Sequence, residues 1–161
     1  MKIKTRITYP EYKRIMLLLS FRKPRVIFFL IIIVLIIINA LFRSMNNRQY
    51  IFLALFLAYT VFVIFRMRGA IKKSYDSNLR LQGEIEYDIT SDKMKITGTS
   101  FNSELDWSTT YKIEELKNWF LVYGSAQTAN LIPKKDMTDD EINTLREIFR
   151  NLHTVKIKKL R

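Results

Sequence analysis

The chain has 161 residues, no cysteine and a formal net charge of +12 at pH 7, with 27 Lys and Arg against 15 Asp and Glu. The lack of cysteine excludes disulfides, thiol catalysis and cysteine-ligated metal sites. The basic excess lies outside the C-terminal half, because residues 74–161 hold 13 Lys and Arg against 14 Asp and Glu. A nucleic-acid-binding domain would carry a basic face, so we expect no nucleic-acid partner.

Residues 1–25 form a basic N-terminal segment with eight Lys and Arg and one acid. Thr8 and Glu11 have the spacing of a capping box, and Pro10 falls in the first turn of the helix that this box predicts. In one interpretation this helix lies at a membrane interface, with Ile15 and its neighbouring leucines toward the lipid. In the other it is a short helix in a solvated tail.

Two uncharged apolar runs follow, at residues 26–42 and 50–65. A helix that is apolar on all faces needs an apolar solvent, and this chain is too short to wrap two such helices in a protein core. At ~1.5 Å per residue the first run extends about 25 Å, near the lower limit for crossing a bilayer. The runs therefore predict a transmembrane helical hairpin over residues 26–65.

Three small or polar residues inside the hairpin are candidates for helix–helix packing. Ala54 and Ala58 are spaced by four, which brings two small side chains onto one face and lets another helix approach closely. Asn39 can donate a hydrogen bond across such a contact. The alternative for Asn39 is hydration near the headgroup boundary.

Basic residues flank the hairpin at both outer ends. Eight Lys and Arg precede the first apolar run, two lie in residues 43–49, and four follow in residues 66–73. The positive-inside rule therefore predicts that both termini are cytoplasmic. The side chains nearest the bilayer are expected to contact anionic headgroups: Arg22, Lys23, Arg25, Arg66, Arg68, Lys72 and Lys73.

Three segments complete the expected organisation. Residues 66–80 continue the second helix as a juxtamembrane linker, and residues 81–153 form a small cytosolic domain. Residues 154–161 are a basic tail in which Val155 and Ile157 alternate with lysines. We expect this tail to lie on the membrane, to lie on the domain, or to be disordered.

The domain begins with a clear β-hairpin pattern. Apolar and charged residues alternate with period two on both sides of a turn near residues 90–93. Pairing Ile89 with Met94 and Asp88 with Lys95 places apolar side chains on one face and opposite charges on the other. The pattern predicts two antiparallel strands in this register.

Further strands are expected at residues 103–107, 119–123 and 129–132, the first with Trp107 toward the core. A last helix begins after Thr138, which forms a capping box with Glu141. The single histidine, His153, is expected to cap the end of this helix or to lie on the surface, and not to be catalytic. Antiparallel strands closed by one amphipathic helix define an α+β fold.

Few residues in the domain suggest chemistry. Glu84, Glu86 and Asp88 alternate on one strand face opposite lysines, so we interpret them as a solvated charged face and predict no metal site. No catalytic residue and no cofactor is predicted. Lys134 and Lys135, after Pro133, are candidate contacts for lipid headgroups or an acidic partner, with a solvated loop as the alternative.

The order of parts resembles the YcxB-like proteins of bacteria. The resemblance rests on the two apolar helices, the strand Tyr87-x-Ile89-Thr90, the strand carrying Trp107, and Ile132-Pro133-Lys134-Lys135 before the last helix. It extends to the N-terminal Thr-x-x-Glu-Tyr motif and so covers essentially the whole chain. The resemblance implies a pleckstrin-homology-like (PH-like) barrel and location in the bacterial membrane, and it supplies no activity.

We therefore expect a non-enzymatic integral membrane protein that displays a small binding or scaffolding domain at the cytoplasmic face. The expected partners are a bilayer with anionic headgroups and a membrane or cytosolic protein, with a homo-oligomer left open. The alternative is an accessory or regulatory subunit of a membrane transport complex that acts through its hairpin.

Overall fold

The computed structural model describes residues 1–42, 46–152, 155–158 and 160. The chain divides into two compact units. One comprises Thr8–Asn78, and the other comprises Met1–Ile7 together with Leu79–Arg161. The helical unit is therefore inserted in the sequence of the second unit.

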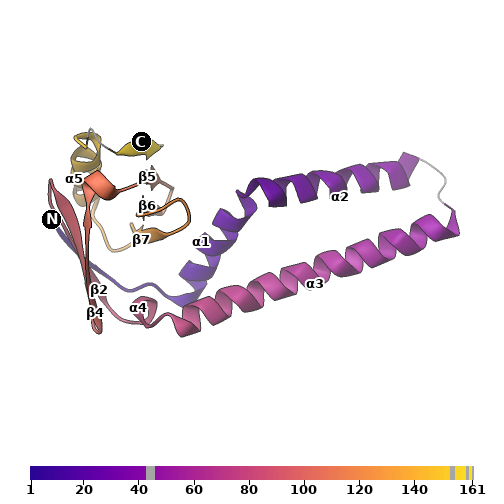
Figure 1. Ribbon diagram of the computed structural model, residues 1–161, viewed down its shortest axis with the longest axis horizontal. Coiled ribbons are helices and arrows are strands. Elements are labelled where there is room, and N and C mark those ends of the chain that lie inside the picture. The colour runs from indigo at the N-terminus through magenta and orange to yellow at the C-terminus, as the bar shows by residue number, and fades with distance from the viewer. Residues whose placement is uncertain (43–45, 153–154, 159, 161) are drawn as a thin grey trace. The chain divides into compact units, whose positions relative to one another are not determined.

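The helical unit contains α1 (Tyr9–Phe21), α2 (Pro24–Phe42) and α3 (Asn47–Ser77). The capping residues expected for α1 are present, since the Thr8 backbone N–H donates to the Glu11 carboxylate at 2.9 Å. Asn46 caps α3: its side-chain oxygen accepts a hydrogen bond from the Gln49 backbone N–H at 3.0 Å. Figure 1 shows α2 and α3 as the two arms of a hairpin.

Helix α1 packs against the C-terminal part of α3. The Tyr12 and Tyr75 rings lie 5.6 Å apart, and the Tyr12 and Ser74 hydroxyls are 3.0 Å apart. Ile15, which the interfacial interpretation placed toward lipid, is buried. The aromatic contact determines this difference, because it turns the Tyr12–Ile15 face of α1 away from solvent.

The second apolar run and the basic segment after it belong to one helix. Helix α3 is continuous for 31 residues, about 46 Å at 1.5 Å per residue. Across the hairpin, the Phe29 ring of α2 lies 5.4 Å from the Phe56 ring of α3.

The second unit begins with a four-stranded sheet, called sheet A here. It consists of β1 (Lys2–Thr5), β2 (Ile85–Ile89), β3 (Lys93–Gly98) and β4 (Phe101–Asp106), paired antiparallel in that order. The short helix α4 (Leu79–Gln82) precedes β2. The pairings Ile89–Met94 and Asp88–Lys95 occur as expected, so the hairpin prediction is confirmed.

Strand β1 was not expected, and it changes the division of the chain. Lys2 pairs with Asp88 and Thr5 with Ile85, so the N-terminal strand completes the edge of sheet A next to β2. The expected basic segment over residues 1–25 is therefore divided near Ile7, and the domain expected over residues 81–153 also contains the N-terminus. Only Ile3 and Thr5 face the core from this strand, too short a pattern to recognise.

The second sheet, called sheet B, follows a 3-10 turn at Trp107–Thr109. Its strands are β5 (Lys112–Glu115), β6 (Trp119–Tyr123), β7 (Ala129–Pro133) and β8 (Lys156–Lys158), in the order β7-β6-β5-β8. Strand β8 comes from the basic tail and pairs parallel with β5. Of the three expectations for this tail, the structure supports contact with the domain.

Helix α5 (Asp139–Arg150) closes the unit, and its expected capping box is present. Leu145 and Phe149 are fully buried on its apolar face. The Phe149 ring packs edge-on against the rings of Trp107 and Phe120, with 5.7 Å between ring centres in each pair. Trp107 is therefore a core residue, as expected. His153 lies outside the described residues.

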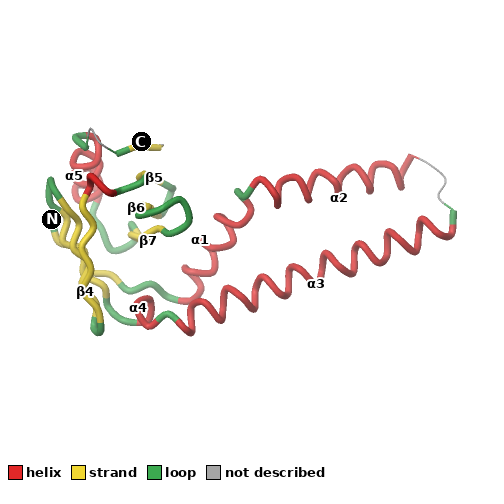
Figure 2. Tube along the Cα trace, viewed as in Figure 1, coloured by secondary structure: helices red, strands yellow, loops and turns green. Residues whose placement is uncertain are grey.

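The structure confirms the α+β class, with N-terminal helices followed by two small sheets and a C-terminal helix (Figures 1 and 2). Over the described residues, strand pairing stays within each sheet, so no closed barrel is formed. The expected barrel closure is therefore absent: β4 is the last strand of sheet A, and β5 pairs within sheet B.

Candidate functional site

The most unusual surface of the protein is the apolar surface of α2 and α3. Twenty large apolar side chains that are exposed to solvent lie on these two helices, among them Phe28, Leu35, Phe52, Phe62 and Phe65. Exposed apolar area of this extent is characteristic of a surface covered by lipid or by another protein. This surface, rather than a cleft, is the first candidate functional site.

Helix α3 is long and apolar enough to cross a membrane, and its most apolar stretch contains no buried residue. It is the one helix to meet the length requirement among the residues that the structure describes, since the apolar part of α2 is the shorter Val26–Ala40. Length and composition alone thus establish one spanning candidate where the sequence predicted two.

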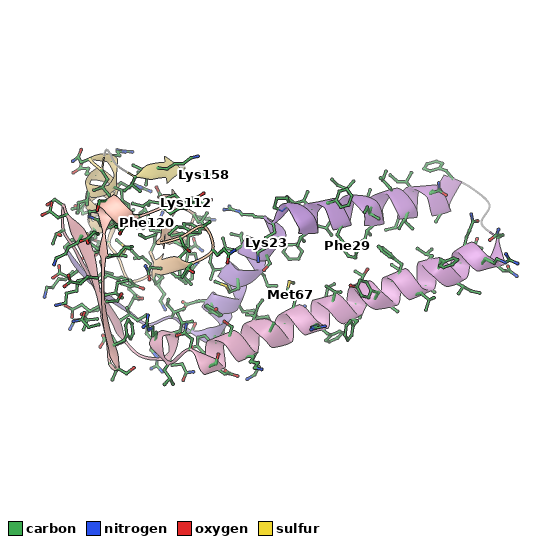
Figure 3. All side chains as sticks on the ribbon, viewed as in Figure 1. Lys23, Phe29, Met67, Lys112, Phe120 and Lys158 are labelled. Atoms are coloured by element: carbon green, nitrogen blue, oxygen red, sulfur yellow. The ribbon has the colours of Figure 1, made fainter. Side chains whose placement is uncertain are left out.

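The predicted membrane-surface residues gather at one end of this helical unit. Arg22 and Lys23 are exposed at the junction of α1 and α2, and Arg25 lies in the first turn of α2. Figure 3 places Lys23 at the same end of the hairpin as Met67, the neighbour of Arg66 and Arg68 on α3. Of the predicted contacts on α3, all four have exposed side chains: Arg66, Arg68, Lys72 and Lys73. Lys72 pairs with Asp76 at 2.7 Å.

The three residues predicted for helix packing are exposed. Asn39, Ala54 and Ala58 all have solvent-accessible side chains, whereas Phe29 and Phe56 make the ring contact across the hairpin. Contact of Ala54 and Ala58 with another helix stays a prediction, and that helix would have to come from outside this hairpin.

A buried ionic cluster joins three elements of the domain. The Glu115 carboxylate on β5 accepts from the Arg146 guanidinium on α5 at 2.7 Å and from the Lys134 ammonium just after β7. The Glu115 side chain is only 1% exposed, against 10% for Lys134 and 21% for Arg146. The hydrogen bond that Arg146 donates to Glu115 raises the pKa of Arg146.

Lys134 and Lys135, the predicted headgroup or partner contacts, have different surroundings. The Lys134 ammonium also lies 4.4 Å from the centre of the Phe120 ring, so two groups of the domain hold it. The Lys135 ammonium donates to the Arg6 carbonyl oxygen at 2.8 Å. Nearby, the Thr5 hydroxyl donates to Asp136 at 2.5 Å. These contacts attach the loop after β7 to the end of β1, and a headgroup role stays a prediction.

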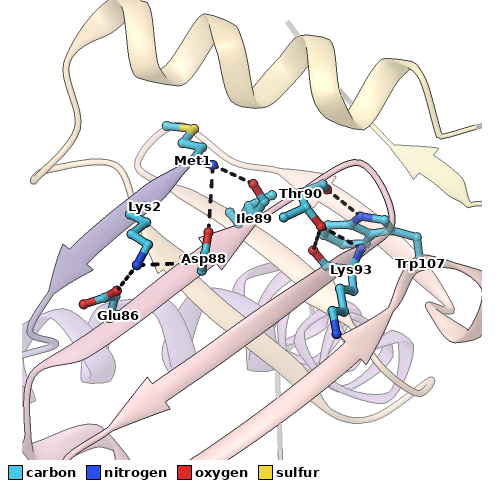
Figure 4. A network of polar contacts seen from close by, with 8 residues as sticks. All are labelled: Met1, Lys2, Glu86, Asp88, Ile89, Thr90, Lys93 and Trp107. Atoms are coloured by element: carbon cyan, nitrogen blue, oxygen red, sulfur yellow. Dashed lines mark hydrogen bonds and ion pairs between the residues drawn. The ribbon is translucent and has the colours of Figure 1, made fainter.

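The acidic face of β2 is paired with lysines, as expected for a charged sheet surface. Glu86 lies 3.4 Å from Lys2, and this hydrogen-bonding partner lowers the pKa of the carboxyl. Figure 4 shows these ion pairs beside the hydrogen bond from the Trp107 indole N–H to the Thr90 carbonyl oxygen, at 3.0 Å. No cluster of three or more His, Cys, Asp or Glu that could hold a metal occurs within the described ranges.

Sequence reasoning did not find Glu115 or its cluster. Its partners lie 19 and 31 residues further along the chain, and the segment around it was ambiguous between turn and strand. The only local signal is a pair of acids, Glu114 and Glu115, within a short strand whose other residues are partly or fully buried.

The fold and these sites define a small two-sheet α+β domain that carries a long apolar helical hairpin inserted after its first strand. Residues 89–149 match the family model of YcxB-like proteins, which confirms the resemblance over this part of the domain. No curated protein and no solved structure matches the chain.

Proposed function

We propose that this protein is a non-enzymatic integral membrane protein of the bacterial cell membrane, which displays its α+β domain as a binding or scaffolding module at the cytoplasmic face. The exposed apolar surface of α2 and α3 supports insertion in lipid. Anchoring would keep the domain near the bilayer and raise its effective concentration for partners there.

The observation that most strongly supports the proposed membrane topology is the pairing of β1 with β2. These strands lie on either side of the helical unit in the sequence, yet they are hydrogen-bonded neighbours in sheet A. Both ends of the inserted segment must therefore lie on the same side of any membrane that it crosses. A single crossing by α3 would separate the two strands, so crossing by α3 requires crossing by α2.

The basic residues support a cytoplasmic location for both ends. Arg22 and Lys23 precede α2, and Arg66, Arg68 and Lys73 lie toward the end of α3 that leads to the domain. Basic residues near the ends of spanning helices favour the cytoplasmic side and attract anionic headgroups.

A PH-like architecture for the domain is part of the proposal. This assignment is supported by the four strands of sheet A, by the three antiparallel strands β5, β6 and β7 of sheet B, and by helix α5 after them. The core residues Trp107, Phe120 and Phe149 join the 3-10 turn and sheet B to α5, as expected where a helix packs on a sheet.

The arrangement of the buried acids supports a binding role over an enzymatic one. The Glu115 carboxylate is occupied by two cations of its own domain, as a structural ion pair is. Glu114 is the other buried acid among the described residues, and it lies near Lys112 at 4.0 Å.

Single cysteines test the topology directly, because the chain has none of its own. We expect Asn47→Cys, at the start of α3, to react with a membrane-impermeant maleimide in intact spheroplasts. Ser125→Cys, in the exposed turn after β6, should react only after lysis. Labelling of Ser125→Cys in intact spheroplasts, or recovery of the chain as a monodisperse species in detergent-free buffer, would refute the proposal.

The exposure of Ala54 and Ala58 favours a second candidate function. If the hairpin itself is the interface, this protein is an accessory subunit of a membrane transport complex. Ala58→Phe should then abolish crosslinking to membrane partners, whereas Tyr59→Phe, at the exposed neighbouring position, should not. Crosslinking that persists in Ala58→Phe but is lost on disruption of the domain would reject this candidate.

A further inference from the structure

The pairing of β8 with β5 differs from the other pairings of the domain. Lys156, Ile157 and Lys158 pair with Lys112, Ile113 and Glu114 in parallel, whereas the other described pairings are antiparallel. Strand β8 has three residues, of which only Ile157 is half-buried. A strand this short, with two exposed lysines, contributes little apolar burial to hold it in place.

The residues of β5 that pair with β8 are more deeply buried than those of β8 itself. Ile113 is fully buried opposite Ile157, and Glu114 is nearly buried opposite Lys158. The Lys112 ammonium lies 4.1 Å from the centre of the Tyr123 ring on β6, the neighbour of β5 on the side away from β8. Figure 3 labels Lys112 and Lys158 on these two strands.

Such an edge recognises an extended segment through two features. The unpaired side of a strand offers backbone hydrogen bonds to any added strand, and the side chains opposite it determine the sequence that fits. Here an apolar residue opposite Ile113 must be followed by a cation opposite Glu114, because a nearly buried carboxylate favours an opposite charge across the pair.

We propose that the β5 edge is a binding site for an extended protein segment with an apolar residue followed by a basic residue, and that β8 occupies this site in cis. This inference rests on the proposed function of the domain as a binding module and names its site. Few residues connect α5 to β8, so the local concentration of β8 is on the order of millimolar. A partner segment binds when β8 is released.

The test uses the full chain in detergent micelles and a fluorescein-labelled peptide, VKIKKLR, which has the sequence of residues 155–161. Ile157→Pro should release β8, since proline is not accommodated within a paired strand. We expect this variant to bind the peptide at least about tenfold more tightly than the unaltered chain. The control variant Lys156→Ala should behave as the unaltered chain, and the charge-reversed peptide VEIEELE should not bind.

Equal peptide affinity for Ile157→Pro and the unaltered chain would overturn the proposal. So would absence of binding by Ile157→Pro with native tryptophan fluorescence. Should that variant not fold, a chain without residues 155–161 must show the same gain. Hydrogen exchange adds an independent readout on the unaltered chain: residues 156–158 should exchange faster than residues 119–123, and equal protection would contradict the proposal.

These outcomes are separable from failure of the proposed function. Absence of peptide binding by a chain that resists carbonate extraction from membranes rejects only the β5 edge as a binding site. A chain that is released from membranes by carbonate rejects the proposed function, whatever the peptide does.

Discussion

The Tyr87 hydroxyl on β2 donates a hydrogen bond of 2.9 Å to the carbonyl oxygen of Leu131 on β7. Tyr87 belongs to sheet A and Leu131 to sheet B, so this bond connects the two sheets through the core. Both residues are buried, and water therefore cannot readily replace either partner.

Replacing Tyr87 with Phe should lower the free energy of unfolding of the domain by about 1 kcal/mol, since the hydrogen bond is lost while the ring remains. Urea unfolding in micelles, followed by tryptophan fluorescence, measures this because both tryptophans lie in the domain. Tyr111→Phe is the matched control, since Tyr111 is 56% exposed. An equal loss in both variants would contradict the assignment.

The same residue gives the domain an alkaline limit. Burial raises the pKa of the Tyr87 hydroxyl above the ordinary tyrosine value. A raised pKa contributes stability that is complete below the ordinary value, about 10, and is lost as pH rises toward the folded-state value. Thermal midpoints between pH 9 and pH 11.5 should fall more steeply in the unaltered chain than in Tyr87→Phe. Parallel curves would refute this.

Removing the charge at the centre of the ionic cluster should be among the more destabilising single changes. Glu115→Gln leaves Lys134 and Arg146 without their anion, and loss of one partner of a buried pair costs about 3 kcal/mol. The partial exposure of Arg146 places the expected loss nearer about 2 kcal/mol. Glu147→Gln, which changes an exposed side chain next to Arg146 on α5, is the control in urea unfolding. A loss below that of the control would show that the cluster is dispensable.

Strand β1 should contribute to the domain although the helical unit separates it from β2 in sequence. Ile3 is buried, so Ile3→Ala should lower the free energy of unfolding by about 2 kcal/mol, the lower end for buried isoleucine. Lys4→Ala, which removes only an exposed pair with Glu86, should leave the free energy of unfolding nearly unchanged. Similar stabilities for Ile3→Ala and the unaltered chain would place β1 outside the folded core.

The parts of the fold that follow from the sequence are those encoded by neighbouring residues. The register of β2 and β3 follows from alternation around a short turn, and Ile89 indeed pairs with Met94. The start of α5 follows from Thr138 and Glu141, which are three residues apart. The apolar runs are recognisable because every turn of the helix repeats the signal.

The parts that could not be predicted depend on contacts distant in sequence. Ile3 and Tyr87 are paired neighbours, yet 84 residues separate them in the chain. The alternation around Ile157 was visible, but nothing local indicates that its strand joins β5 in parallel. Glu115 resembles any surface acid until Lys134 and Arg146 are brought to it by β7 and α5.

The insertion of the helical unit between β1 and β2 also fixes an order of assembly. During translation β1 leaves the ribosome before either apolar helix, and it must wait until β2 has been made before it can form its ladder. Under the proposed topology, a chain whose hairpin entered the lipid incorrectly would leave Ile3 on the far side of the membrane from Tyr87. If that topology holds, sheet A can close only in a chain that is correctly inserted.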